Sequence, residues 1–350
     1  MTRGYLDNLV GSPAYAESTK NWHITLQQSS CYWYDLIVNP PDFVNTKDSI
    51  SSQLEDLRAT VEQTLEKRFI YFFASRTKVR FDVTRPPKYS FWNKWIIITL
   101  LVGRDRKRYK IKIKFQSAEG QTLTPRIEVS ERFIRIIHCA KVSQTFSIHD
   151  FLQTFDIWIG ISTQVHYVGI TKDPADRPLS RKHRGITDTL YNVSNEENDF
   201  FVFINLFKVM SNAKNNAHQL HFVVANSMID EIPTEEEGVV VESALIAYFD
   251  CASQQINRGN ERAKLSNRLA FLAEKHNIQS VSVHLEMESP NEYFAFGSDS
   301  ISVALSHTFL FRYANGKIEM ERFASEDELR TSQDEANDIT FHSSGCSTYW

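Results

Sequence analysis

The sequence has few cysteines, and none of them lie close together. Its four cysteines, Cys31, Cys139, Cys251 and Cys346, include no CxxC pair. This spacing argues against a zinc site and against a disulfide framework, and it suits the reducing cytoplasm. Long apolar runs are also missing, since the longest, at 95–102, is far shorter than the roughly 20 residues that span a bilayer. The N-terminal residues are polar and do not resemble a signal peptide. We therefore expect a soluble, cytoplasmic protein.

A strong excess of one charge is missing too. The chain of 350 residues carries 39 Lys and Arg against 43 Asp and Glu, which gives a net charge of −4. A nearly neutral chain gives no general reason to expect nucleic-acid binding, so any such case must come from local patches. Apolar residues, by contrast, are plentiful: 42% of the chain is hydrophobic, and 24 residues are Phe. This content is ample for packed cores and argues against global disorder.

The hydrophobic pattern predicts an α+β fold in three parts. In the first part, residues 1–150, apolar residues recur at helical spacing over 50–65, and several strand candidates follow, so we expect a helix packed on an antiparallel sheet. The second part, 151–262, holds the motifs described below and is expected to form a small three-stranded sheet with flanking helices. The third part, 263–350, is expected to hold further strands and an acidic tail after a helix at 260–278.

A basic segment lies in the first part. In KIKIKF at 110–115, lysines alternate with apolar residues, so on a strand all the lysines share one face. One interpretation is a solvated face whose lysines protect a sheet edge. The other is a surface that contacts nucleic-acid phosphates. The residues assigned to such a surface are Arg104, Lys107, Arg108, Lys110, Lys112 and Lys114.

Three separated segments in the second part carry polar residues in an unusual setting. The first, FDIWIGISTQVHYVGITKDPADR at 155–177, is typical of two short strands joined by a turn and followed by a loop that ends at Arg177. The second, 239–249, places Glu242 on the apolar stripe of a predicted helix. A carboxylate there needs a partner, either a buried Arg or a metal ion. The third is Asn257, just past that helix.

These segments resemble the GIY-YIG nuclease family. In that family a first strand carries Gly-Ile-Tyr, a second carries Tyr-Ile-Gly, an Arg follows, and a distal helix carries a Glu before a closing Asn. Here YVG at 167–169 matches the second motif, Arg177 stands ten residues after its Tyr, and Glu242 and Asn257 match the distal Glu and the Asn. The resemblance covers less than a third of the chain. It implies a small core sheet, whose third strand we place at 220–227.

The first strand departs from the family pattern. Aligned on the predicted hairpin, DIW at 156–158 stands where Gly-Ile-Tyr is expected, so Trp158 takes the position of the first Tyr. Because Trp accepts no proton, either Tyr167 or the neighbouring His166 is expected to activate water, or the site is weakened. His183 is a further candidate acid or base, because family members often carry a His after the Arg.

The resemblance implies a metal-dependent endonuclease that hydrolyses phosphodiester bonds. Glu242 would hold Mg²⁺ or Mn²⁺, since a hard cation of this kind takes few protein ligands and keeps several waters. Arg177 would bind the phosphate, and Tyr167 would orient or deprotonate water. Asn257 would fix the local geometry. Further contacts to nucleic acid are expected from Arg181, Lys182 and Arg184.

The organisation of the segments around the module resembles that of restriction and other defence nucleases, and this resemblance implies DNA as the substrate and restriction or antiviral defence as the role. The sequence shows none of the helix-hairpin-helix or zinc elements that family members in DNA repair carry. RNA presents the same phosphodiester and remains an alternative substrate. A homodimer is compatible with the sequence, and no membrane partner is expected. The rival hypothesis is a non-catalytic nucleic-acid-binding or scaffold protein with a decayed GIY-YIG fold, which Trp158 favours and the other motif residues oppose.

Overall fold

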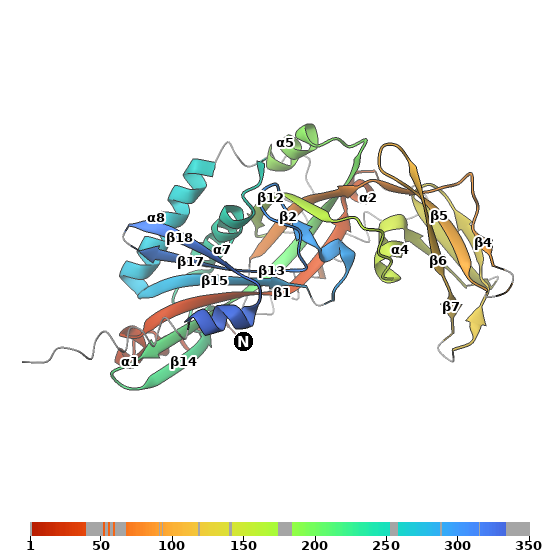
Figure 1. The fold of residues 1–350 in the computed structure, drawn as a ribbon. Helices are drawn as coiled ribbons and strands as arrows, with labels where there is room; N and C mark the ends of the chain where they lie inside the picture. The colour runs from red at the N-terminus through yellow and green to blue at the C-terminus, as the bar shows by residue number, and fades with distance from the viewer. Residues whose placement is uncertain are drawn as a thin grey trace, which may run out of the picture.

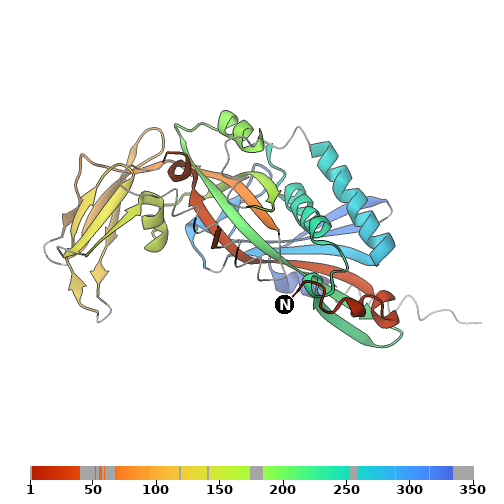
Figure 2. The same ribbon diagram turned by 180° about the vertical axis from the view of Figure 1, so that it is seen from behind.

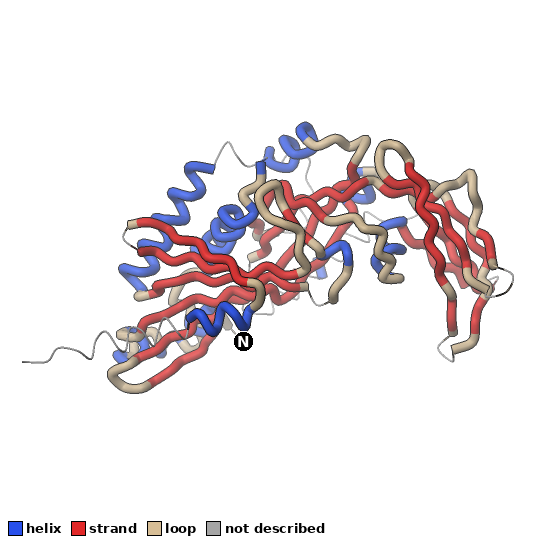
Figure 3. The backbone as a smooth tube through the Cα atoms, in the orientation of Figure 1, coloured by secondary structure: helices blue, strands red, loops and turns tan. Residues whose placement is uncertain are grey.

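The computed structural model describes residues 2–39, 68–90, 94–117, 120–139, 142–173, 184–252, 258–287, 289–314 and 316–333, together with 52, 55, 56, 59 and 92. It is a mixed α+β structure, as the sequence predicts. Two regions stand apart: a large sheet with helices, and a smaller all-β unit at the other end of the molecule (Figures 1 and 3). None of the helices in the described part of the chain combines the length and apolarity that crossing a bilayer requires.

Among the described residues, nine strands form one mixed sheet. In spatial order they are β16 (Phe296–Gly297), β12 (Thr163–Thr171), β2 (Phe69–Thr77), β13 (Asn198–Asn215), β1 (Thr19–Trp33), β15 (Ile278–Glu286), β17 (Ser306–Ala314) and β18 (Lys317–Phe323), with β14 (Leu220–Ala225) beside the far half of β13. The pairs β12–β16 and β1–β15 are parallel, and the others are antiparallel. Strands β1 and β13 are the longest, and they lie side by side in the middle of the sheet (Figure 2).

The central strands are apolar because both faces of the sheet are covered. Strand β2 is buried along nearly its whole length, and so is the first half of β13. On one face lie α7 (Thr234–Phe249) and α8 (Arg258–His276), where the ring of Phe249 packs 5.5 Å from that of Phe72. On the opposite face lie α2 (Tyr34–Val38) and α5 (Arg184–Asn192), where Tyr34 packs edge-on against Phe73. Adjacent residues of β2 thus point to opposite layers.

The all-β unit is an insertion between two neighbouring strands of the large sheet. It begins directly after β2 and ends before β12, and it is drawn in yellow at one end of Figure 1. Its strands are β3 (Val79–Phe81), β4 (Lys88–Tyr89), β5 (Ile96–Val102), β6 (Lys107–Ile113), β7 (Phe115–Gln116), β8 (Thr122–Leu123), β9 (Arg126–Val129), β10 (Phe133–Cys139) and β11 (Val142–Ser147). Helix α4 (Ile148–Thr154) follows them and leads back towards β12. Strands β2 and β12 are therefore paired in space but far apart in sequence.

Short helices complete the fold around the ends of the sheet. They are η1 (Asp7–Leu9), α1 (Pro13–Ala16), α6 (Asn226–Ile229) and η3 (Glu292–Phe294). Beside β14, the side chains of Tyr15, Ala213, Val224 and Ile229 form a second, small core that is separate from the main one.

The structure corrects two expectations about domains and pairing. Strands from all three predicted parts, 1–150, 151–262 and 263–350, share the large sheet, so the boundaries at 150 and 262 do not separate its strands. The predicted hairpin does not form either, because the residues before β12 are not a strand. Their backbone N–H groups are satisfied differently: Ile159 and Ile161 both donate to the buried carboxylate of Glu292. The predicted strand at 220–227 exists as β14, but it pairs with β13 and not with β12.

The predicted helices have mixed outcomes. The helix expected at 260–278 is α8, which begins two residues earlier and ends two residues earlier. The helix expected at 50–65 lies almost wholly outside the described residues.

A buried histidine is expected to make the stability of the large sheet depend on pH. His307 is 4% exposed; Tyr248 Oη donates to its Nδ1, and its Nε2 donates to the Phe296 carbonyl. Burial lowers the pKa of His307 to about 4, against 6.5 in a model peptide. As the pH falls below about 6.5, the unfolded state takes up this proton first, so stability is full above that pH and is lost towards pH 4.

Unfolding in urea at pH 7 and pH 5 measures this effect. The parent is expected to lose about 2 kcal/mol more than the His307→Gln variant over this interval, at about 1.4 kcal/mol for each pH unit. Equal losses in the two proteins would contradict a buried neutral His307.

Candidate active site

Two tyrosines meet on the face of the sheet opposite α7. Strands β2 and β12 run antiparallel in a register that places Tyr71 opposite Gly169 and Phe73 opposite Tyr167. The rings of Tyr71 and Tyr167 stack at a centroid distance of 5.9 Å and an interplanar angle of 30°. Tyr71 is fully buried, whereas Tyr167 is partly exposed. The pair therefore has one anchored ring and one that reaches solvent.

Gly169 makes this stack possible. A Cβ atom at that position would lie 2.6 Å from both Cζ and Oη of Tyr71 and 2.8 Å from Cε1 of Tyr167. Such distances are well below van der Waals contact, so any larger residue would push the two rings away. The glycine of the YVG segment is thus required by the packing of the tyrosines.

Glu242 is held at the residue next to Gly169. Its Oε1 accepts a hydrogen bond of 2.9 Å from the backbone N–H of Ile170. Helix α7 comes close enough for this contact because Gly238 has no side chain: a Cβ there would lie 2.7 Å from Cδ1 of Ile170. The half-buried carboxylate is therefore anchored to β12.

Two cations lie beside this point. Arg68 precedes β2 and Lys172 follows β12, and both form ion pairs with the exposed Glu235 in the first turn of α7, Arg68 at 2.8 Å. The hydrogen bond from Lys172, together with the charges of Lys172 and Arg68, lowers the pKa of Glu235, so this carboxylate stays ionised near neutral pH. The cations follow the strands that carry the tyrosines, and both lie against the first turn of α7.

His166 occupies a different place from Tyr167. A register shift in β12 lies between Val165 and Tyr167, and the imidazole Nε2 of His166 lies 2.7 Å from Oγ of Ser75. Burial lowers the pKa of His166, with the charge of Asp299 acting in the opposite direction. His166 thus faces the part of β2 that is four residues beyond Tyr71.

The remaining predicted site residues divide by whether the structure describes them. Tyr167 lies in β12, and Glu242, 75 residues later in sequence, bonds to the backbone N–H of Ile170 in the same strand. Arg177, His183, Asn257, Arg181 and Lys182 lie outside the described residues. Arg184 is the first residue of α5, and its side chain is likewise outside the description.

Trp158 is not the partner of Tyr167, which corrects the expected alignment. Its indole is 47% exposed, and Nε1 donates to Asp156 Oδ1 two residues away. The residue that does stack on Tyr167 is Tyr71, in the segment Phe69-Ile70-Tyr71. The sequence carried this signal as FIY within an apolar run, but the all-β insertion separates it from YVG.

The basic strand of the insertion is split between paired and exposed charges. Lys110, Lys112 and Lys114 are exposed on one side of a strand whose Ile111 is buried, as the alternation predicts. Among the described residues, no ion pair involves these lysines or Lys107. Arg104 and Arg108, by contrast, form ion pairs with Glu197 and Asp82.

Substituting Gly169 tests the packing of the tyrosine pair. Gly169→Ala is expected to lower the free energy of unfolding by about 1–3 kcal/mol, the usual cost of inserting a methyl group into a packed region. Gly11→Ala is the matched control, because the nearest heavy atom to a Cβ there lies 3.9 Å away. Urea denaturation measures both variants. If the two changes had equal effects, the close packing at Gly169 would be refuted.

The site has few metal-binding side chains. No group of three or more His, Cys, Asp or Glu residues gathers in a way that could hold a metal ion, as far as the structure describes the chain. Among the described residues, the oxygen donors assigned to the site are the Glu242 carboxylate and the hydroxyls of Tyr71 and Tyr167. Comparisons with protein-family models, with curated proteins and with solved structures find no match for this chain.

Proposed function

We propose that the protein is a metal-dependent endonuclease of the GIY-YIG type that hydrolyses phosphodiester bonds in DNA. The observation that carries the proposal is that Tyr71 and Tyr167 stack beside Gly169, while Glu242 accepts a hydrogen bond from the backbone N–H of the next residue, Ile170. The resemblance requires a tyrosine on each of two paired strands and a glutamate from a distal helix. Paired strands β2 and β12 supply the first two, and α7 supplies the third.

Each group has a role that its position supports. Tyr167 is partly exposed, so its hydroxyl can orient or deprotonate the attacking water, and Tyr71 holds that ring by stacking on it. Lys172 and Arg68 can offset the negative charge of the phosphate, alongside Arg177. His166, paired with Ser75, is assigned no step.

The donor set fits Mg²⁺ or Mn²⁺. Mg²⁺ keeps several of its waters and binds proteins through one or two carboxylates, so a single anchored Glu242 suits it. When bound there, the ion would polarise the phosphoryl oxygen and assist the leaving group. The hydrogen bond from Ile170 keeps the Glu242 carboxylate oriented in the absence of any ion.

The alternative, a non-catalytic protein with a decayed fold, rested on Trp158 in the first tyrosine position. Assigning Tyr71 to that position, on the strength of its stacking with Tyr167, weakens the reason for preferring the alternative. DNA is favoured as the substrate, with RNA as the second possibility to be tested in the same assay. Restriction or antiviral defence remains the proposed role, and the all-β insertion is the proposed DNA-reading unit.

The test of the proposal is cleavage of plasmid DNA, and of an RNA of similar length, in the presence of Mg²⁺. Loss of cleavage on adding a chelator is expected if the reaction needs the metal. Absence of any cleavage with either divalent metal and either nucleic acid would favour the non-catalytic alternative.

The exposed lysines of the insertion are expected to contact DNA phosphates. Each phosphate contact contributes about 0.9 to the slope of log affinity against log salt concentration. Replacing Lys110, Lys112 and Lys114 together with Ala should therefore weaken binding and flatten the slope by up to about three units. Filter binding or anisotropy over a range of salt concentrations measures this.

Two exposed lysines elsewhere control for a loss of positive charge outside the insertion. Lys275 and Lys317 are exposed on the large-sheet part of the molecule, and replacing both with Ala should leave the slope nearly unchanged. If the triple variant also keeps the parent slope, the lysines form a solvated sheet face, the first of the two interpretations of this segment.

A further inference from the structure

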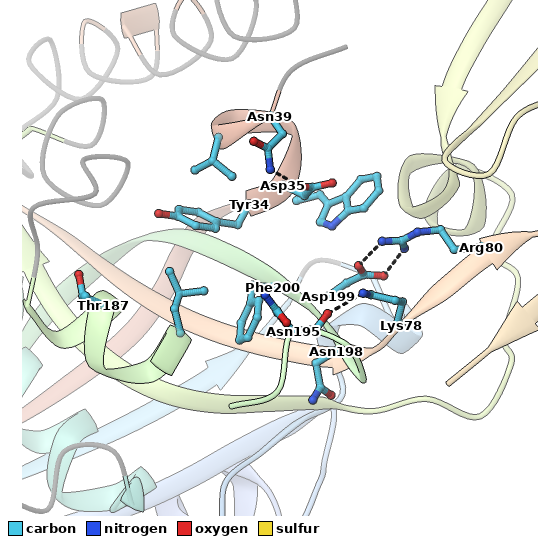
Figure 4. A pocket seen from close by; sticks show the side chains of 13 residues that line it. Tyr34, Asp35, Asn39, Lys78, Arg80, Thr187, Asn195, Asn198, Asp199 and Phe200 are labelled. Atoms are coloured by element: carbon cyan, nitrogen blue, oxygen red, sulfur yellow. Dashed lines mark hydrogen bonds and ion pairs between the residues drawn. The ribbon is translucent and has the colours of Figure 1, made fainter. Parts of the chain in front are cut away.

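A cavity of about 520 Å³ lies where the insertion joins the large sheet. Figure 4 shows Tyr34, Asp35 and Asn39 of the α2 region on one side, and Asn198, Asp199 and Phe200 at the start of β13 on the other. Thr187 of α5 closes one end, and Lys78 and Arg80 lie at the other. This volume is in the range of sites that hold small molecules, about 300–1,000 Å³.

Aromatic rings give the cavity flat and rigid walls. Phe200 stacks on Phe73 at 5.5 Å with an angle of only 10° between the rings, and Tyr34 packs edge-on against the same Phe73. Trp33 lines the cavity as well and packs edge-on against the buried His149. Planar rings fixed in this way offer a surface on which another planar ring can stack.

Hydrogen-bonding groups surround these walls. Asn39 donates to Asp35, and the side chains of Asn195 and Asn198 complete a set of amides that can both donate and accept. This mixture of donors and acceptors is the kind that reads the edge of a base.

The charged end of the cavity is fixed by an ion pair. Arg80 forms a bidentate ion pair with Asp199, in which the two N–O distances are 2.7 and 2.9 Å. Burial would raise the pKa of Asp199, but His149 and Arg80 outweigh it and hold that pKa well below its usual range. Asp199 is thus ionised and neutralises Arg80, which leaves Lys78 as the cation available to a phosphate. Its Nζ donates to the backbone carbonyl of Asn195.

The cavity and the tyrosine pair lie on the same face of the sheet. Phe73 is opposite Tyr167 across the strands and stacks on Phe200 in the cavity wall, so one row of aromatic rings joins the two places. Phe200 is opposite Ser75, four residues along β2 from Tyr71. At about 3.3 Å for each strand residue, Ser75 lies roughly 13 Å from Tyr71 along β2. This distance corresponds to about four nucleotides of a stacked nucleic-acid strand.

We propose that this cavity binds a single nucleobase, stacked between the aromatic walls, with its phosphate beside Lys78. The inference rests on the proposed nuclease function, because the substrate strand is what supplies the base. The bound base would belong to a nucleotide that is unstacked a few positions from the cleaved bond. An enzyme that takes one base out of the stack gains selectivity for single-stranded or weakly paired sites.

A plugging variant tests the cavity without disturbing the core. Thr187 is exposed on α5 and lines the cavity, so the larger side chain of Thr187→Trp would occupy part of its volume. Tyr191→Trp is the matched control, since Tyr191 is 90% exposed on the same helix and does not line the cavity. Binding is measured without divalent metal, so the result does not depend on cleavage. The probes are a short single-stranded DNA oligonucleotide and free deoxyadenosine monophosphate.

The parent is expected to bind both probes more tightly than Thr187→Trp by about tenfold or more, as for loss of one base–aromatic stack. A series of oligonucleotides, each with an abasic site at a different position, locates the bound base. The parent should bind one member of the series more weakly than the others, and Thr187→Trp should bind all members alike. Tyr191→Trp should behave as the parent.

Two other results are distinguishable. If Thr187→Trp weakens only the free nucleotide, the base is recognised but the substrate strand is the wrong source. If neither probe is affected, the cavity is not a base site and the proposal is overturned. Cleavage assays on Glu242 variants test the nuclease function separately, because they leave the cavity intact.

Discussion

Replacing Glu242 with glutamine is expected to abolish cleavage of plasmid DNA in Mg²⁺ while leaving the fold and DNA binding intact. The glutamine oxygen can still accept the hydrogen bond from Ile170 N–H, so α7 stays anchored to β12. The negative charge that would hold the cation is lost, and with it the stabilisation of the developing phosphoryl charge. Loss of one such interaction typically lowers the rate by at least a hundredfold, on the order of 10²–10³.

Comparing Glu242→Gln with Glu242→Ala separates the metal from the anchor. Alanine removes both the charge and the acceptor, so it should also reduce the free energy of unfolding, by about 1–3 kcal/mol for an unsatisfied half-buried N–H. Glu236→Gln is the control, because Glu236 is exposed on the same helix. Cleavage by Glu242→Gln at the parent rate would refute its assignment as the metal ligand.

Local features of the fold could be read from the sequence. The alternating segment around YVG is β12, the apolar stripe around Glu242 is α7, and the helix expected at 260–278 is α8 to within two residues at each end. The lysine alternation in β6 also holds. In each case the information is periodic and lies within a few residues, so packing elsewhere in the chain does not change it.

The pairing of strands could not be read in this way. A strand shows which of its faces is apolar but not which strand lies beside it, and the nearest strand in sequence is the usual expectation. Here the insertion separates β2 from β12, and Glu292 takes the backbone N–H groups of Ile159 and Ile161 that a hairpin partner would have used. The expected alignment pairs β12 with the residues just before it, and Trp158 is therefore placed where the first Tyr is expected.

Arg68 and Lys172 were missed for a related reason. Each lies one residue outside a strand, in a position that looks like an ordinary surface charge in sequence. They become neighbours only because β2 and β12 pair and Glu235 of α7 binds both. Sites assembled from several strands are therefore least visible where single residues at strand ends contribute to them.

Removing single hydroxyl groups tests which residue completes the tyrosine pair. Tyr167→Phe keeps the ring that stacks on Tyr71 but removes the group that orients or deprotonates water. The cleavage rate is expected to fall by roughly 10²–10⁴, the contribution of a positioned acid or base. The fold should be preserved, because the contacts of the ring with Tyr71 and Gly169 are unchanged. Single-turnover cleavage with saturating DNA measures the loss without a contribution from binding.

Tyr71→Phe and Trp158→Phe then compare the two positions proposed for the first tyrosine. Tyr71→Phe keeps the ring stack with Tyr167, so any fall in the cleavage rate assigns a role to the Tyr71 hydroxyl itself. The fall is expected to be smaller than that of Tyr167→Phe, because Tyr71 is fully buried and Tyr167 is the ring that reaches solvent. Trp158 contacts Asp156 at the surface, and Trp158→Phe should cleave at the parent rate. The reverse order, with a loss at Trp158 and none at Tyr71, would return the site to the alignment suggested by sequence. It would also mean that β12 presents its catalytic groups to the loop before it and not to β2.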